Sequence, residues 1–240
     1  ISLGTAVVFE SADTRYTSVT YDTNTQKVLI SYQDYTNSGY GTAIVGTVSG
    51  TAISFGTASV FRSASTTYLT SAYEPTEQKI GIVFTDGGHY SRLRGCVATI
   101  SGTSVSFGSV TQIAGYVVTN KSVVYAANAQ RMVVFYRNNS NGYGGAVVFS
   151  ISGTTITYRA GADFNSNYTQ RPFATYDSSA EKVILTYANA ANNDYGTAIV
   201  CTVGASSISF GTPVVFVSSG IYSSTATYDV LANKTGITYD

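Results

Sequence analysis

Apolar and polar residues alternate over short segments of this chain, and clusters of turn-forming residues separate the segments. A period of two predicts strands rather than helices. Between residues 16 and 61 the predicted strands are Thr17–Tyr21, Lys27–Tyr32, Tyr40–Val48 and Ala52–Phe61. The two-residue link Ser49-Gly50 joins the third strand to the fourth, and a short link containing glycine is typical of a tight hairpin.

The same four-strand pattern recurs with a nearly fixed period. A signature of the Ile-Ser-Phe-Gly-Thr type opens the fourth strand, and its copies start near residues 1, 53, 105, 156 and 208, at intervals of 52, 52, 51 and 52 residues. Such a period predicts a propeller, a solenoid or an array. Four antiparallel strands repeated radially favour the propeller, because it leaves few exposed sheet edges. We predict an all-β fold, a β-propeller of four-stranded antiparallel blades with five blades.

Two aromatic columns recur in the aligned repeats. The second strand carries Tyr32, Phe84, Tyr136, Tyr187 and Tyr239 at one position. The first strand carries Tyr21, Tyr73, Tyr125, Tyr176 and Tyr228 at one position. We expect both columns to pack inside the blades, which removes them from the candidates for ligand binding.

The strand pattern resembles a known family. The segments Ser18–Asp22, Val28–Asp34 and Phe210–Phe216 resemble the blades of sialidase-like propellers built from bacterial neuraminidase repeats. The Asp-box of that family would lie at the turn within Val48–Phe55, where this chain has neither the Asp nor the Trp. The repeats are also similar to tandem repeats of large surface or tail-fibre-like proteins of marine bacteria and their viruses.

The strand count leaves the last blade incomplete. We expect residues 1–240 to form a single repeat domain with four complete repeats, a leading fourth strand and a trailing pair between Tyr222 and Asp240. Three explanations are open: the natural chain continues past Asp240, a neighbouring chain donates the strand through self-association, or the ring has more than five blades. We favour continuation, and the start at Ile1 without a Met also indicates a processed or excised segment.

Composition excludes several classes of partner. Hydrophobic residues make up 44% of the chain and charged residues only 11%, yet no apolar run reaches the roughly 20 residues that span a bilayer. Thirteen cationic residues balance thirteen anionic ones, so no electropositive field draws nucleic acid. Cys96 and Cys201 fall in repeats that would not be neighbours, so we expect buried small side chains rather than a disulfide.

The loops between the second and third strands vary most among the repeats. These long loops span residues 33–39, 85–91, 137–142 and 188–194. Amide, hydroxyl and tyrosine groups suit a sugar, because they combine paired donors and acceptors with flat rings. The alternative is that Asn, Gly and Ser only form turns there. The candidate ligand-binding residues are Asp34, Tyr35, Asp86, His89, Tyr90, Arg92, Asn138 and Asn189.

Repeat two departs furthest from the consensus. It carries Asp86, His89, Tyr90, Arg92 and Arg94, and His89 is the only histidine of the chain. Because arginine can hold a carboxylate with two hydrogen bonds, these residues indicate an anion or carboxylate-sugar contact. The alternative is sequence drift on a solvated loop.

A sialidase needs an arginine triad, a tyrosine nucleophile beside a glutamate, and an aspartic acid. Arg15, Arg92, Arg137 and Arg171 fall on the face of the long loops, whereas Glu74, Glu77 and Glu181 belong to turns on the opposite face. We therefore expect no catalytic residues and no enzyme, with sialidase-type hydrolysis as an outlier. No Asp-x-Asp-x-Asp loop occurs, so we expect neither a metal nor another cofactor.

Two functions from different classes follow. The first is a non-catalytic propeller module of an extracellular, virion or cell-surface protein that serves adhesion and binds a glycan or surface receptor. The second is a structural repeat that builds a fibre, sheath or coat. Sequons occur at Asn120, Asn138, Asn167 and Asn233, but their number in a Ser- and Thr-rich chain does not identify a compartment.

Overall fold

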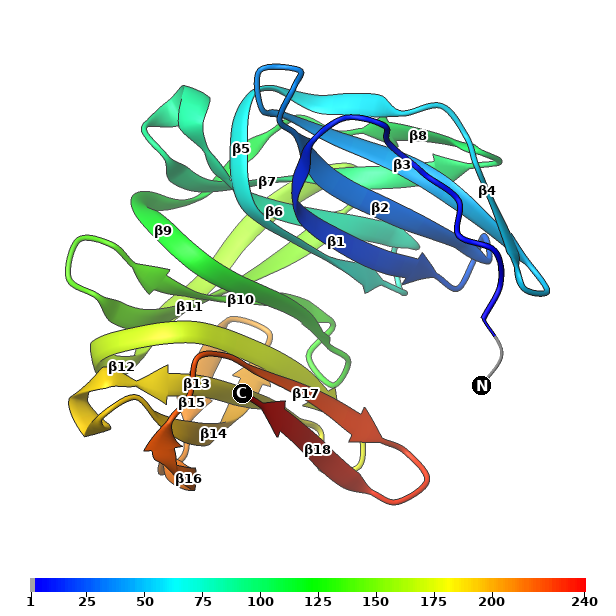
Figure 1. The fold of residues 1–240 in the computed structure, drawn as a ribbon. Helices are drawn as coiled ribbons and strands as arrows, with labels where there is room; N and C mark the ends of the chain where they lie inside the picture. The colour runs from blue at the N-terminus through cyan, green and yellow to red at the C-terminus, as the bar shows by residue number, and fades with distance from the viewer. Residues whose placement is uncertain (1–2) are drawn as a thin grey trace. The chain divides into compact units, whose positions relative to one another are not determined.

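The computed structural model describes residues 3–240, and nearly all of its regular structure is β strand (Figure 1). Two short 3-10 turns, η1 (Gly87–His89) and η2 (Ala190–Asn192), are the only helical residues in that range, which confirms the all-β prediction. Ile1 and Ser2, which open the first signature, lie outside the described residues. No helix between residues 3 and 240 is long and apolar enough to cross a membrane.

The chain divides into two compact units, and each is described separately. The first contains the residues up to Gln112 together with Ile151–Ile156. The second contains Ile113–Ser150 and Thr157–Asp240. The prediction of a single repeat domain and the prediction of five blades both stay predictions.

The first compact unit holds the first two repeats as antiparallel sheets. Neighbouring strands pair in the order β1-β2-β3-β5-β6-β7, with β4 on β3 and β8 on β7. The strands are β1 (Thr14–Asp22), β2 (Lys27–Asp34), β3 (Tyr40–Ser49), β4 (Ala52–Phe55), β5 (Ser59–Glu74), β6 (Lys79–Asp86), β7 (Arg92–Ser101) and β8 (Ser104–Phe107). The predicted first, second and third strands are thus confirmed, whereas the predicted leading fourth strand is wrong, because residues 3–13 form no strand.

The predicted fourth strand, Ala52–Phe61, is divided in the structure. It is made by β4 and, after a break at residues 56–58, by the beginning of β5. The first part of β5 pairs with β3, whereas its second part pairs with β6 of the next repeat. No Gly or Pro interrupts β5, so the chain passes from one sheet to the next without a loop.

The signature glycine lies against the hairpin turn of the following repeat. A Cβ atom on Gly56 would lie 1.9 Å from the carbonyl oxygen of Thr103, and one on Gly4 would lie 1.8 Å from that of Thr51. Only a residue without a side chain fits at that separation. The recurrence of glycine in the signature is therefore explained by contact between successive repeats.

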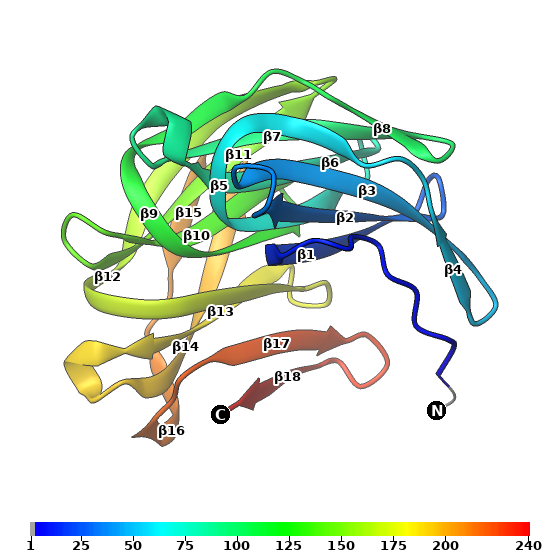
Figure 2. The ribbon, with the colours of Figure 1, turned by 45° about the horizontal axis from the view of Figure 1, so that its top comes forward.

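The second compact unit has the same layout. Its strands are β9 (Thr111–Ala126) from Ile113 onward, β10 (Arg131–Asn138), β11 (Tyr143–Ser152) up to Ser150, β12 (Thr155–Asp177) from Thr157 onward, β13 (Lys182–Asn189), β14 (Tyr195–Gly204), β15 (Ser207–Phe210), β16 (Val214–Gly220), β17 (Ser224–Asp229) and β18 (Lys234–Tyr239). The end of β12 pairs with β13, as β5 pairs with β6. Figure 2 shows β17 and β18 side by side, and they form a sheet of two strands.

The second-strand aromatic column fills the core in four repeats. Tyr32, Phe84, Tyr136 and Tyr187 are at most 2% exposed, whereas Tyr239 of β18 is 52% exposed. The first-strand column packs less well than predicted, because its member Tyr21 is exposed and the others are only partly buried. Cys96 and Cys201 are buried and not disulfide-bonded, which confirms their predicted role. Burial raises the pKa of the Cys201 thiol to about 12.

Candidate functional site

The last residue of each second strand caps the long loop that follows it. The Asp34 carboxylate accepts from the backbone N–H of Asn37, and that of Asp86 accepts from Gly88. The Asn138 and Asn189 side chains accept in the same way from Ser140 and Ala191. Such side-chain caps explain why Asp or Asn recurs at this position. Four of the predicted ligand-binding residues thus have a structural function, and their binding role stays a prediction.

A strained backbone position, which the sequence reasoning did not find, recurs beside the long loops. Tyr16, Tyr68, Asn120 and Arg171 occupy one position in the aligned repeats, and all have a positive φ between 47° and 51°. The strand register shifts at this point in every one of the four repeats. Left-handed backbone at a residue other than glycine is unfavourable and concentrates at functional sites. In the sequence this position is marked only by its change of residue type from repeat to repeat.

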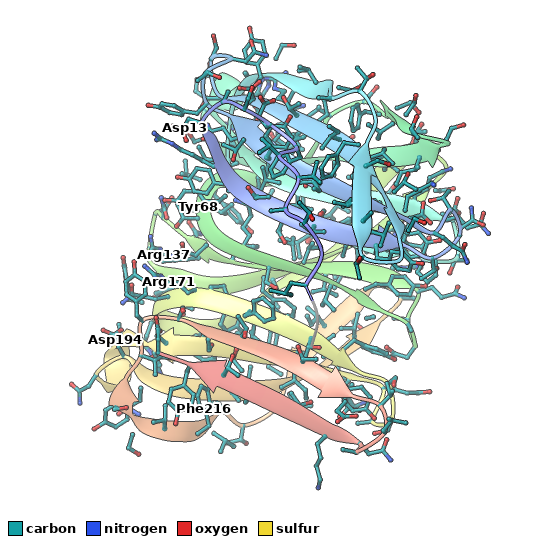
Figure 3. All side chains as sticks on the ribbon, turned by 45° about the vertical axis from the view of Figure 1, so that its right-hand side comes forward. Asp13, Tyr68, Arg137, Arg171, Asp194 and Phe216 are labelled. Carbon is teal, nitrogen blue, oxygen red and sulfur yellow. The ribbon has the colours of Figure 1, made fainter. Side chains whose placement is uncertain are left out.

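In the first compact unit, this position carries a pair of tyrosines. The rings of Tyr16 and Tyr68 lie 4.9 Å apart, and burial followed by the neighbouring Tyr68 raises the pKa of the Tyr16 phenol. The Arg15 guanidinium lies 3.4 Å above the ring of Tyr35, one of the predicted residues, and donates to Asp13. We call Arg15, Tyr16, Tyr35 and Tyr68 the tyrosine cluster. Figure 3 shows Asp13 and Tyr68 on one side of this unit.

The corresponding position in the second compact unit carries Asn120 in one repeat and Arg171 in the next. The Arg171 guanidinium lies 3.2 Å above the ring of Tyr222. Arg137 of the long loop donates to the hydroxyl of Tyr168 at 2.7 Å. The labelled Arg137, Arg171 and Asp194 follow one side of this unit in Figure 3. Both compact units therefore place arginine–tyrosine pairs next to their long loops.

Repeat two contains a buried ion-pair cluster. The Asp86 side chain is 0% exposed; its Oδ1 atom accepts from Arg62 Nε at 3.0 Å, and its Oδ2 atom lies 3.5 Å from Arg94 Nη1. Arg94 Nη2 also donates to the Val110 carbonyl oxygen at 2.9 Å. Sequence reasoning had named Asp86 and Arg94 but missed Arg62, because its position holds an unrelated residue in every repeat.

The remaining predicted residues of repeat two surround this cluster. Arg92 is opposite Asp86 in the β6–β7 register. Its guanidinium lies 5.4 Å from the ring of Tyr90, and the exposed His89 and Tyr90 rings are 6.3 Å apart. Among residues 3–240 no group of three or more His, Cys, Asp or Glu side chains is placed to hold a metal ion.

Comparisons with solved structures identify the fold. An exo-β-1,3-galactanase from Clostridium thermocellum superposes with a TM-score of 0.55 at 10% identity, over 94% of this chain and 54% of that one. An endo-arabinase from Bacteroides thetaiotaomicron gives 0.51 at 10% identity, over 95% and 89%. The lectin of Aleuria aurantia, solved with α-methyl-L-fucoside, gives 0.51 at 14% identity, over 88% and 66%.

These neighbours are β-propellers, and this chain has the β-propeller fold. It spans about half the length of the galactanase. No family model matches the sequence. A search of curated proteins also found no match. The resemblance to propeller blades is thus confirmed, whereas the likeness to sialidase-type and tail-fibre-like repeats stays a prediction.

The prediction that the chain is not an enzyme is corrected by these comparisons. It relied on the missing sialidase residues, but the neighbours include a galactanase and an arabinase, which are glycoside hydrolases of other kinds. The absence of one catalytic set does not exclude another on the same fold.

Proposed function

We propose that this protein recognises carbohydrate on the side of its long loops. The observation that carries the proposal is the tyrosine cluster, in which the paired Tyr16 and Tyr68 rings stand on left-handed backbone beside the Arg15–Tyr35 stack. The left-handed backbone is shared with Asn120 and Arg171 and so belongs to the repeat rather than to the tyrosines, of which Tyr16 is exposed and Tyr68 only partly buried. It does fix the direction in which the two rings project.

The chemistry of the cluster suits a sugar ring. The C–H face of a sugar packs on a flat aromatic ring, and the phenol and guanidinium groups at the edge donate hydrogen bonds to hydroxyls. Arg15 is held by both Asp13 and Tyr35, so little side-chain entropy is lost when a ligand binds. The Arg171–Tyr222 pair offers similar groups in the second compact unit.

The fold supports this class of ligand, because its neighbours include a lectin and enzymes that act on glycans. We place the protein outside the cell or on a cell or virion surface, where adhesion through a glycan would use such a module. Asp34, Asn138 and Asn189 shape the loops in this proposal, and Tyr35 contacts the ligand.

A glycan array that includes β-1,3-galactan, arabinan and fucosylated oligosaccharides tests the proposal. We expect reproducible binding to a subset of the glycans, and a tenfold or greater loss of affinity in Tyr16→Ala and Tyr68→Ala. Such a loss corresponds to about 1.4 kcal/mol, within the usual range for an aromatic contact. Tyr21→Ala is the matched control, because Tyr21 is an exposed tyrosine further along β1.

Three outcomes would contradict the proposal: an array without binding, unchanged affinity in both cluster variants, or an equal loss in the Tyr21 control. An array without binding, together with concentration-dependent polymers in light scattering, would favour the structural-repeat alternative. Measuring released reducing ends on every bound glycan distinguishes recognition from hydrolysis.

A further inference from the structure

We propose that Arg62 of β5 and Arg92 and Arg94 of β7, next to the long loop of repeat two, bind the carboxylate group of an acidic sugar. The proposal rests on the carbohydrate recognition argued above and assigns a ligand class to a second place in the first compact unit. It starts from the distribution of charge around Asp86.

The buried cluster contains two positively charged side chains and one negatively charged side chain, so its net charge is positive. Two guanidinium groups, of Arg62 and Arg94, face the single carboxylate of Asp86. A charge that is withdrawn from water without a partner is costly. The Arg62 and Arg94 side chains remain 25% and 15% exposed, so an anion in solution can reach them and supply the missing negative charge.

Two polar atoms in the cluster are also left without hydrogen bonds. Among the described residues, Asp86 Oδ2 and Arg94 Nε are buried and have no hydrogen-bond partner. The 3.5 Å between Oδ2 and Arg94 Nη1 exceeds the roughly 2.7–2.9 Å of a charge-assisted bond. Native structures contain few such atoms. A bound carboxylate would accept from the donor Arg94 Nε, whereas the acceptor Asp86 Oδ2 would need a hydrogen-bond donor. Arg94 therefore keeps unused donor capacity.

The other repeats show that the loop does not need these arginines. Where repeat two has Arg94, the other complete repeats have Thr42, Gly145 and Thr197. The positions that correspond to Arg62 hold Glu10, Ala114, Asn165 and Val217. Asp34 caps its loop in repeat one without an arginine at either position. Both arginines thus occur together, Arg62 on β5 and Arg94 on β7, although the loop caps of the other repeats form without them.

The surrounding side chains complete a site for a charged sugar. Arg92 and Arg94 are two residues apart on β7 and so project from the same face of the sheet. Arg92 lies near the exposed ring of Tyr90, which offers a stacking surface. The planar fork of a guanidinium matches the two oxygens of a carboxylate, which favours a uronic acid or a related sugar acid over a neutral sugar.

Calorimetric titration with oligogalacturonate, with neutral oligogalactose and with a sulfated galactose oligomer tests the proposal. Arg94→Thr introduces the residue of repeats one and four, and Arg92→Gln changes the rim of the site. We expect at least tenfold weaker binding of oligogalacturonate in both variants, and weaker binding by the unmodified protein as salt increases. The neutral and sulfated oligomers should bind less tightly than oligogalacturonate.

Lys79→Gln is the matched control for net charge. Lys79 begins β6, and Asp86 ends it, so the control removes one positive charge from the same strand about 23 Å away. It should leave the affinity within twofold. Circular dichroism and Tm establish that each variant is folded, and Arg94→Lys, which keeps the charge but loses the fork, should bind with intermediate affinity.

Unchanged affinity in folded Arg94→Thr and Arg92→Gln would overturn the proposal, as would an equal loss in Lys79→Gln or equal binding of the sulfated oligomer. Failure of this inference is distinguishable from failure of the proposed function. If the unmodified protein binds neutral glycans through Tyr16 and Tyr68 but no uronate, only this inference is wrong. If the protein binds no glycan of any kind, both are wrong.

Discussion

An arginine–aspartate ion pair lies beside the long loop of repeat one and another beside that of repeat two, and the two pairs differ in exposure to water. Beside the first loop, Arg15 and Asp13 lie 3.0 Å apart, and both side chains are 48% exposed. In the second, Arg62 and Asp86 also lie 3.0 Å apart, but Asp86 is fully buried. Because the distances are equal, a difference in energy comes from the burial of Asp86 and from the second arginine beside it, Arg94. Ion-pair geometry alone therefore does not measure what a pair contributes to stability.

The largest effect is expected at the buried carboxylate. Asp86→Ala should lower the free energy of unfolding by about 3–5 kcal/mol, because it leaves the Arg62 and Arg94 charges partly buried and unpaired. Urea denaturation measures the change. Asp86→Asn is the control: it keeps an oxygen for the Gly88 N–H and should lose less. If Asp86→Ala lowered the free energy of unfolding by less than about 1 kcal/mol, water would reach the cluster, and the two ion pairs would not differ as proposed.

An intermediate loss of stability is expected at Asp34, which corresponds to Asp86 but has no arginine at the positions of Arg62 and Arg94. Asp34→Ala removes the bonds from the Asn37 N–H and the Thr36 hydroxyl, which should cost about 1 kcal/mol because the freed groups can turn to water. Asp34→Asn should be close to the unmodified protein. If Asp34→Ala lowered the free energy of unfolding as much as Asp86→Ala, the loss of the loop cap rather than the buried charge would explain both results.

The smallest effect is expected at the exposed pair. Asp13→Ala and Arg15→Ala should each change the free energy of unfolding by less than about 1 kcal/mol, and a double-mutant cycle should give a coupling energy that disappears in 1 M NaCl. The same cycle on Asp86 and Arg62 should keep most of its coupling in high salt. Equal salt sensitivity of the two cycles would contradict the difference in burial.

The sequence predicts the strands well because their determinants are local. Alternating apolar residues and turn residues are sufficient to place the first three strands of each repeat, and the Ser-Gly turns mark the hairpins. The continuous β5 was missed because Phe61 to Thr70 reads equally well as the end of one strand and the start of another. Its division between two sheets depends on which neighbours pair with it, and these are distant in sequence.

The candidate site was only partly predictable. The variable loops drew attention to Tyr35 and to Asp86, and the structure places both beside arginines. Tyr16 and Tyr68 come just before the predicted first strands of their repeats, and Arg62 follows the predicted strand Ala52–Phe61; all three were missed because the repeats share no single residue type at these positions. Their significance comes from a positive φ at two of them and from a contact across two strands at the third, and neither is encoded in local residue type.

The continuous strand β5 also bears on how the first compact unit responds to force. A pull on one sheet is transmitted along an unbroken backbone to the next, since Ser59 to Ser65 and Thr66 to Glu74 bond to different partners. No flexible linker separates the two sheets, so pulling one sheet apart also breaks hydrogen bonds in the other. In a single-molecule stretching experiment the two repeats should rupture in one step of about a hundred residues rather than two steps of about fifty. The mechanical element would then be larger than the period of the sequence.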